Sequence, residues 1–275
     1  MHYLLASRGR RQLNLLVGAS TLYAFDFDGT LARIVRNHQD AQLARPIQKW
    51  LVELNKRAAT AVISGRSVAD LQTRVAGSVP HLIGNHGLEG LHATPQVLRQ
   101  ARDTCITWKR QVENGFGSEL SRVGTTVEDK TYSLALHYRK VARKREAREV
   151  VFKVLAQLSP SPRILFGKDI VNVIPVGTPH KGVALFELMH QLNRTSALYV
   201  GDDETDEDVF SLPDARIVTV RIGKKKTSAA RFYLKRQSEI TKLLRYLVKA
   251  YDRNDKAWAS RREPPLRAYL SEPLG

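Results

Sequence analysis

Cysteine is almost absent from this chain of 275 residues: Cys105 stands alone, so no internal disulfide can form. No apolar run approaches the roughly 20 residues that a membrane span needs. The short apolar runs near the N-terminus are interrupted by Arg8, Arg10 and Arg11, so neither is long enough for the core of a secretory signal. We therefore expect a soluble cytoplasmic protein, and we interpret Cys105 as a small buried residue of a helix.

Acidic residues are scarce relative to basic ones, with 27 Asp and Glu against 44 Lys and Arg, which gives a formal net charge of +17. The excess is local: residues 221–236 hold seven Lys or Arg and no acid, and residues 138–148 hold six against one Glu. The aromatic residues of these runs, Tyr138, Phe232 and Tyr233, are not interleaved with the basic residues in the way that is typical of stacking on bases. Nucleic-acid binding therefore ranks last, behind a solvated surface and behind steering of an anionic substrate.

The order of predicted elements indicates an α/β fold. Residues 21–87 alternate strand and helix, with helices expected near 44–57 and 68–76 and a third strand near 81–84. The same pattern resumes after residue 177 and continues to about residue 251. Alternation of this kind favours a parallel sheet with helices on its faces.

A different pattern interrupts this alternation. We expect a helix over 95–114, alternating segments at 120–127 and 132–138 joined around 128–130, a helix over 144–158, and strands at 163–166 and 170–174. This is one compact α+β insert. We accordingly divide the chain into a basic N-terminal arm (1–20), a core domain (21–90 and 178–251), a cap domain (91–177) and a C-terminal tail (252–275).

Two carboxylates follow the first strand of the core. Asp26 and Asp28 are one residue apart and precede Gly29, so they point the same way if the strand continues. They repel each other unless a cation joins them. The chemistry that suits them is Mg²⁺-assisted attack on a phosphate by one carboxylate, while the other moves the proton. Asp-Gly is also a common turn pair, so the motif depends on its context.

That context lies at three later points. The strand at 61–63 ends in Ser64, Lys181 opens an amphipathic helix, and the strand at 198–200 ends in an acidic cluster at 202–206. A cation at the positive end of a helix dipole is unfavourable unless an anion sits there. We expect Asp26 and Asp202 to hold a metal ion, and Ser64 and Lys181 to hold phosphate oxygens.

These four motifs resemble those of the haloacid dehalogenase (HAD) superfamily of phosphohydrolases. Within it, residues 22–247 resemble the trehalose-6-phosphate phosphatase family, through the segments 84–89, 127–130 with 137–139, and 201–207. The resemblance implies a Rossmann-like parallel-sheet core with an inserted α+β cap of the C2 type. It also implies Mg²⁺-dependent hydrolysis of trehalose 6-phosphate, or of a similar sugar phosphate, through an aspartyl-phosphate.

The resemblance assigns roles to particular residues. Asp26 is the nucleophile and Asp28 the proton carrier, so the expected catalytic set is Asp26, Asp28, Thr30, Ser64 and Lys181. The expected metal ligands are Asp26, Asp28 through its backbone carbonyl, Asp202, and Asp206 through water. The expected substrate-binding residues are Arg66, His86, Glu89, Glu128, Lys130, Arg139 and Asn172. A surface salt bridge is an equal alternative for Arg66, and a structural role is an alternative for His86.

The chain departs from the family at Asn172 and Ile174, where the resembled enzymes carry glutamate and a basic residue. An amide accepts hydrogen bonds without the charge-assisted strength of a carboxylate. Two alternatives therefore stay open beside trehalose 6-phosphate hydrolysis. One is a phosphatase of a related sugar or glycosyl phosphate, and the other is a non-catalytic partner of a trehalose-phosphate synthase, which the complete catalytic motifs oppose.

Overall fold

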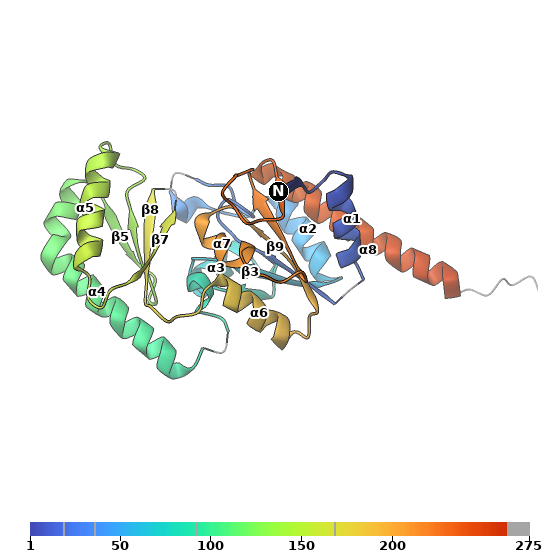
Figure 1. Cartoon of the computed structure of the whole chain (residues 1–275), viewed down its shortest axis with the longest axis horizontal. Coiled ribbons are helices and arrows are strands. Elements are labelled where there is room, and N and C mark those ends of the chain that lie inside the picture. The colour runs from blue at the N-terminus through green and yellow to red at the C-terminus, as the bar shows by residue number, and fades with distance from the viewer. Residues whose placement is uncertain (19, 36, 92, 168, 263–275) are drawn as a thin grey trace, which may run out of the picture.

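Two β-sheets organise the molecule (Figure 1). The computed structural model describes residues 1–18, 20–35, 37–91, 93–167 and 169–262, with 256–262 described by their backbone alone. The strands are β1 (His2–Tyr3), β2 (Thr21–Phe25), β3 (Ala59–Ile63), β4 (His81–Ile83), β5 (Thr126–Asp129), β6 (Leu134–His137), β7 (Arg163–Gly167), β8 (Ile170–Ile174), β9 (Ser196–Gly201), β10 (Ile217–Ile222) and β11 (Phe232–Leu234). The α-helices are α1 (Ser7–Leu16), α2 (Arg45–Asn55), α3 (Val68–Val75), α4 (Pro95–Arg122), α5 (Lys144–Gln157), α6 (Lys181–Gln191), α7 (Glu207–Phe210) and α8 (Ile240–Arg262). Short 3₁₀ turns are η1 (His38–Asp40), η2 (Asn85–Gly87), η3 (Glu204–Asp206) and η4 (Gln237–Glu239).

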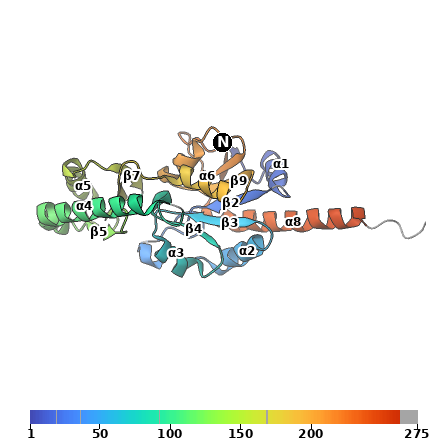
Figure 2. The same cartoon turned by 90° about the horizontal axis from the view of Figure 1, so that it is seen from below.

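The larger sheet is parallel throughout, in the order β1-β11-β10-β9-β2-β3-β4. The side chains of its interior strand β2 alternate between the two faces, so that Tyr23 and Phe25 pack toward α1, α2 and α8 while Leu22 and Ala24 pack toward α6. Figure 2 shows α2 and α3 on one face and α6 on the other. Because β2 lies between β9 and β3, the strand order reverses there, and ligands bind at the carboxyl ends of strands at such a point.

The segment that we expected to be a separate N-terminal arm contributes β1 and α1 to the core, contrary to that expectation. Strand β1 pairs with β11, and Leu4, Leu13 and Leu16 are buried in the same cluster as β2. Gly9 permits this packing, because a Cβ there would lie 2.0 Å from the backbone oxygen of Leu4. A two-residue strand carries no periodicity, which is why the sequence did not predict it.

The predicted C-terminal tail begins inside a helix. Helix α8 runs from Ile240 through Arg262, so residues 252–262 continue the helix that packs against α2. Residues 263–275 of the predicted tail lie outside the described residues.

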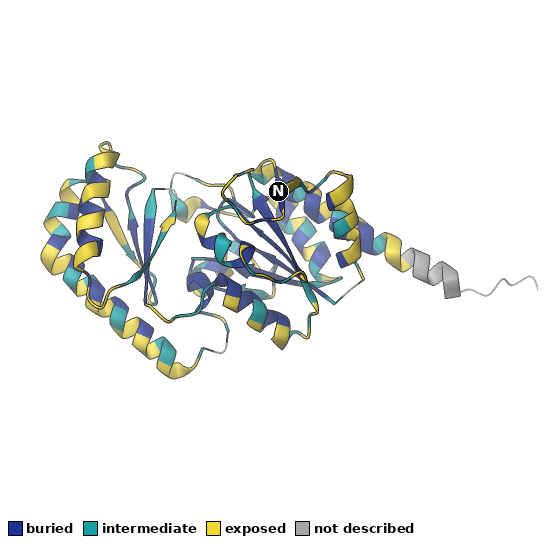
Figure 3. Ribbon diagram, in the orientation of Figure 1, coloured by how far each residue is buried: buried dark blue, intermediate teal, exposed yellow. Residues whose placement is uncertain are grey.

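The smaller sheet is antiparallel, in the order β5-β6-β8-β7, and α4 and α5 cover one of its faces (Figure 1). Leu134, Leu136, Val171 and Val173 face these helices and form a separate hydrophobic cluster with them. Figure 3 shows that the outer surfaces of α4 and α5 are exposed. The opposite face of this sheet points toward the core, and it carries the cross-strand row Glu128, Ala135 and Asn172.

Two boundaries in this region differ from the prediction. Helix α4 continues to Arg122 because Phe116 and Leu120 extend its buried stripe, so the strand expected at 120–127 begins only at Thr126. The turn expected at 128–130 lies later, since Glu128 and Asp129 are strand residues and the backbone N–H of Lys130 bonds the carbonyl of Ser133 at 3.0 Å.

We propose that the chain has a core of residues 21–90 and 178–251, extended by β1 and α1, and a cap of residues 91–177. The proposal rests on the two separate sheets and on their separate hydrophobic clusters. Within the part of the chain that the structure describes, no helix is long and apolar enough to cross a membrane.

Candidate active site

A cavity of about 360 Å³ lies between the carboxyl ends of the core strands and the uncovered face of the cap sheet. Most of the residues that the sequence predicted for the site line it: Asp26, Asp28, Ser64, Arg66, His86, Glu128, Lys130, Arg139, Asn172, Lys181 and Asp202. Thr30, Glu89 and Asp206 do not line the cavity themselves. Side chains at the ends of the core strands and side chains of the cap sheet thus face one space.

Lys181 connects two of the carboxylates. At the start of α6 it is 1% exposed, and its Nζ donates to Asp26 Oδ1 at 2.8 Å and to Asp206 Oδ1 at 2.7 Å. Burial acts against the ammonium charge, but the two carboxylates outweigh it and raise the pKa of Lys181. A permanent cation therefore lies directly beside Asp26.

Burial raises the pKa of Asp26 to about 7, with Lys181 acting against the shift and Asp206 and Asp28 adding to it. Burial and the neighbouring charges of Asp26 and Asp206 raise the pKa of Asp202 to about 9. Oxygen atoms of Asp26, Asp202 and Asp206 lie within 4.8 Å of one another. Such crowding of carboxylates in a buried place is relieved by a divalent cation, and the acidic cluster is compatible with a metal ion.

Asp206 has little capacity left for direct metal binding. Besides Lys181, its carboxylate accepts hydrogen bonds from the Tyr199 hydroxyl at 2.7 Å and from the backbone N–H groups of Asp202 and Asp203 at 2.8 and 2.9 Å. It therefore holds the loop that presents Asp202. Asp206 thus has less free capacity for a cation than the neighbouring carboxylates of Asp26 and Asp202.

Two further residues shape the position of Asp202. The Thr30 hydroxyl donates to Asp202 Oδ1 at 3.4 Å. Gly29 has a left-handed φ of +82°, and a Cβ there would lie 2.0 Å from Asp202 Oδ2. The glycine of the first motif is thus needed both for its backbone conformation and for the space that Asp202 occupies.

Arg66 positions Asp28. Its guanidinium donates to both carboxylate oxygens of Asp28, at 2.6 and 2.7 Å, to Asp70 at 2.7 Å, and to the backbone oxygen of His38 at 2.7 Å. Arg66 forms salt bridges, as the alternative interpretation of the sequence expected, but it is 7% exposed, so they are buried and do not lie at the surface. Burial acts against the charge of Arg66, and the bonds to Asp28 and Asp70 raise its pKa. Its donors are engaged within the protein and not directed at a sugar.

The cap hairpin reaches the ends of the core strands through Lys130. Its Nζ donates to the Gly65 carbonyl at 3.2 Å and to Asn172 Oδ1 at 3.3 Å. Asn85 of the core accepts from the Ser133 hydroxyl at 2.8 Å and donates to the Lys130 carbonyl at 3.1 Å. Burial lowers the pKa of Lys130. These bonds place the cap hairpin directly on the core.

Glu128 and Arg139 also connect the two parts. Burial alone would raise the pKa of Glu128, but a 2.7 Å bond with His137 and the charge of Lys130 lower it to about 2. The Arg139 guanidinium donates to the Val35 carbonyl at 2.9 Å, so the cap also contacts the loop that follows the first motif.

His86 and Glu89 take different positions. The ring of His86 is buried against Gly65, and neither ring nitrogen has a hydrogen-bond partner among the described residues. Burial and the charges of Lys130 and Lys181 hold its pKa well below the usual range, although Asn172 acts against the shift. Glu89 accepts from Val68 N–H and Asn85, each at 2.9 Å, so it braces the loop after β4.

Sequence reasoning missed Arg221, which we had placed in a solvated basic run. It lies at the end of β10, beside Gly201 of β9, and its guanidinium donates to the Asp202 carbonyl. Its Nε is buried without a partner among the described residues, and the side chain lines the cavity. The available signal was its position at the carboxyl end of a strand in a parallel sheet. His38 and His137 also line the cavity and were not predicted as site residues.

Solved structures of similar fold include a trehalose-6-phosphate phosphatase related protein (TM-score 0.67, 21% identity, 85% of this chain and 99% of that one). Another is the C-terminal domain of the trehalose-6-phosphate phosphatase of C. albicans (TM-score 0.68, 19% identity, 90% and 98%). The parallel core with its carboxylates at strand ends and its inserted α+β cap is thus a fold that these solved structures share.

The sequence comparisons narrow this class. A family model described as trehalose-phosphatase matches residues 24–248, and the chain belongs to that family. A trehalose-phosphate phosphatase of Mycobacterium avium is 33% identical over 206 residues, which cover 71% of this chain and 52% of the relative. Trehalose-phosphate phosphatase B of Arabidopsis thaliana is 26% identical over 258 residues, which cover 86% and 68%. The chain thus spans about half the length of the mycobacterial relative.

Proposed function

We propose that this chain is a Mg²⁺-dependent phosphatase that hydrolyses trehalose 6-phosphate to trehalose and phosphate through an aspartyl-phosphate on Asp26. The observation that carries the proposal is the Asp26 carboxylate, which lies between Lys181 and Asp202 in a cavity roofed by the cap. The names of the similar proteins support the choice of substrate.

The first half of the proposed reaction forms a bond from an Asp26 oxygen to phosphorus and breaks the bond from phosphorus to the sugar oxygen. Lys181 and Ser64 hold phosphoryl oxygens, and Asp28 gives its proton to the leaving oxygen. In the second half, water attacks phosphorus, Asp28 takes the proton of that water, and Asp26 is released. A bound Mg²⁺ would neutralise phosphate charge next to Asp26 and Asp202.

Arg66 fixes the side of the site from which Asp28 acts. In the bidentate pair Asp28 is an acceptor, which is the form needed to take a proton from water. Donation to the sugar oxygen requires that Asp28 turn from Arg66 toward the substrate. Its side chain is 42% exposed toward the cavity and has room for that movement.

The proposed sugar site is the cap wall of the cavity, formed by Glu128, Lys130, Asn172 and Arg139, with His86 on the core side. Asn172 is buried and its carboxamide oxygen already faces Lys130. This amide, where the family carries glutamate, favours a related sugar or glycosyl phosphate as the second candidate substrate. A synthase partner and a cytoplasmic location stay predictions.

The test is phosphate release from a panel of sugar phosphates that includes trehalose 6-phosphate. We expect trehalose 6-phosphate to give the highest kcat/KM, with activity lost in excess chelator and restored by Mg²⁺. Ca²⁺ should restore it poorly, because its larger and looser coordination shell disturbs in-line attack. Full activity in chelator, or no release from any member of the panel, would contradict the proposal.

A further inference from the structure

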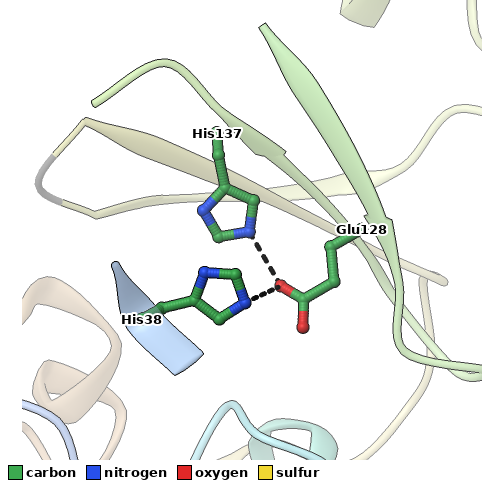
Figure 4. A group of neighbouring side chains, drawn as sticks. All are labelled: His38, Glu128 and His137. Atoms are coloured by element: carbon green, nitrogen blue, oxygen red, sulfur yellow. Dashed lines mark hydrogen bonds and ion pairs between the residues drawn. The ribbon is translucent and has the colours of Figure 1, made fainter. Parts of the chain in front are cut away.

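A second cluster of metal-binding side chains lies away from the acidic centre, where the cap meets the core. His38 belongs to η1 of the core, whereas Glu128 and His137 belong to β5 and β6 of the cap (Figure 4). The three offer ligand atoms that lie within 4.8 Å of one another. The mechanism proposed above gives neither histidine a role.

Two distances between ligand atoms of this cluster are near those found around a coordinated ion. Glu128 Oε2 lies 2.7 Å from His137 Nε2 and 3.7 Å from His38 Nε2. In a tetrahedral zinc site, bonds of about 2.0–2.1 Å place neighbouring ligand atoms about 3.3 Å apart. The two observed distances bracket that value. Figure 4 shows a nitrogen of each ring directed at the same carboxylate oxygen.

The side chains of the cluster are ordered by contacts within the protein and are accessible to an ion from solvent. The two imidazole rings stack at 4.7 Å with an interplanar angle of 13°. The exposed fractions of His38, His137 and Glu128 are 37%, 18% and 33%, so an ion can enter. All three line the cavity, which leaves an open coordination position for water. The backbone oxygen of His38 accepts from Arg66 at 2.7 Å, which holds η1 in place.

We propose that His38, Glu128 and His137 form a second metal site, which binds one divalent transition ion of the Zn²⁺ class and thereby fixes the cap to the core. Two imidazoles and one carboxylate suit Zn²⁺, Co²⁺ or Ni²⁺ and not Mg²⁺, which prefers oxygen ligands. The positive charges of Lys130 and Arg66 near Glu128 and His38 oppose any cation at this place, so nitrogen coordination, and not charge alone, has to hold the ion.

Occupation of this site has a consequence for the proposed function, on which this step rests. An ion bound to Glu128 removes that carboxylate from the sugar wall and links η1 to the cap hairpin. Zn²⁺ is therefore expected to inhibit hydrolysis of trehalose 6-phosphate in competition with the sugar, even with Mg²⁺ in excess.

The experiment is a titration of the full chain with Co²⁺, with Mg²⁺ in large excess to hold the acidic site. Ligand-field absorption in the visible range reports nitrogen-containing, tetrahedral coordination. We expect one equivalent bound, at least tenfold weaker binding in His38→Ala and in His137→Ala, and unchanged binding in His190→Ala, whose ring is exposed on α6. Zn²⁺ should displace the Co²⁺ and raise the melting temperature of the wild type but not of His38→Ala.

Equal Co²⁺ binding by wild type, His38→Ala and His137→Ala would overturn the proposal, since the ion would then lie elsewhere. An absence of any Co²⁺ absorption in the wild type would overturn it as well. Because this titration uses no sugar phosphate, a failure of the proposed phosphatase activity leaves its result intact, and the two proposals fail separately.

Discussion

Asp26 is the residue whose chemistry has no substitute in the proposed mechanism. Asparagine matches its size but cannot attack phosphorus, and Lys181 keeps Asp206 as a partner. We expect Asp26→Asn to lower phosphate release at least a hundredfold, about 2.7 kcal/mol of barrier, with an unchanged fold by circular dichroism. Asp103→Asn, on the exposed face of α4, is the matched control. Retention of a tenth of the wild-type rate would remove Asp26 from the nucleophile role.

Gly29 allows a second test at the scale of one residue. A Cβ at Gly29 meets Asp202, whereas a Cβ at Gly77, which also has positive φ, has nothing within 4 Å. Alanine at either position costs about 1–2 kcal/mol of backbone strain. Gly77→Ala should therefore keep its turnover at a lower melting temperature, while Gly29→Ala should lose activity as well. Similar kcat values for the two variants would show that the space beside Asp202 is not critical.

The position of a candidate site residue could be predicted from the sequence where that residue directly follows a predicted core strand. Asp26, Ser64 and Asp202 each follow a buried apolar run, and in a parallel sheet such ends converge. Arg221 was hidden because a strand-end arginine inside a basic run looks like any solvated cation. His38 and His137 were hidden because their contact joins segments 99 residues apart, and one sequence does not record such a pairing.

Helix α3 depends on Asp70 in its first turn, which bonds Arg66 and Arg74. Burial would raise the pKa of Asp70, but the bonds from Arg74 and Arg66 lower it from 3.8 to about 2. Since the folded-state pKa is depressed, the carboxylate stabilises the protein above pH 3.8, and this contribution is lost as the pH falls toward 2.

We expect Asp70→Asn to lower the stability at neutral pH by about 1 kcal/mol, a value reduced for partial exposure. The difference in melting temperature between wild type and variant should shrink as the pH falls from 4 toward 2. Asp103→Asn, which is exposed, should show no such trend. A difference that stays constant with pH would mean that the Asp70 carboxylate charge does not contribute.

In the proposed mechanism the cap hairpin recognises the sugar, whereas the core carries out the phosphate chemistry. Lys130 contacts Asn172 and Gly65, whereas Lys109 pairs with Asp129 outside the cavity. Energy from binding the remote sugar is expected to close the site. Lys130→Ala should therefore lower kcat/KM for trehalose 6-phosphate by two orders of magnitude and affect a small activated phosphate ester little. Lys109→Ala should leave both substrates near the wild-type values.

A proportional loss on both substrates would show that Lys130 supports the core and not sugar recognition. Asn172→Glu belongs in the same assay. If trehalose 6-phosphate is the substrate, the family's carboxylate should hold or raise its turnover, whereas a large loss would favour a different sugar.

The end of a helix was predicted closely where proline residues follow it, and poorly where burial continues the helix. Helix α5 was expected over 144–158 and runs from Lys144 to Gln157, because Pro160 and Pro162 follow it. Helix α4 was expected to end near residue 114, but it continues through Gly115 and Gly117 to Arg122. Burial of Phe116 and Leu120 against the cap sheet outweighs the low helix propensity of these glycines.

The charge of the whole molecule affects how an anionic substrate arrives. The formal net charge is +17, and Arg221 and Lys130 line a cavity that also holds the carboxylates. Lys225 pairs with Glu204 of η3, the turn whose Thr205 lines the cavity. Long-range attraction between exposed charges is screened over about 10 Å at 0.1 M salt, whereas the buried contacts of Lys181 are screened much less.

Raising the NaCl concentration should therefore lower kcat/KM for trehalose 6-phosphate severalfold and leave kcat nearly unchanged, because binding is weakened before the chemistry is affected. Sucrose at matched viscosity is the control, since it slows diffusion without screening charge. The charge-reversal variant Lys226→Glu should flatten the salt dependence while its kcat stays at the wild-type value. If kcat/KM does not change with salt concentration, the excess of basic residues forms a solvated surface and does not steer the substrate toward the site.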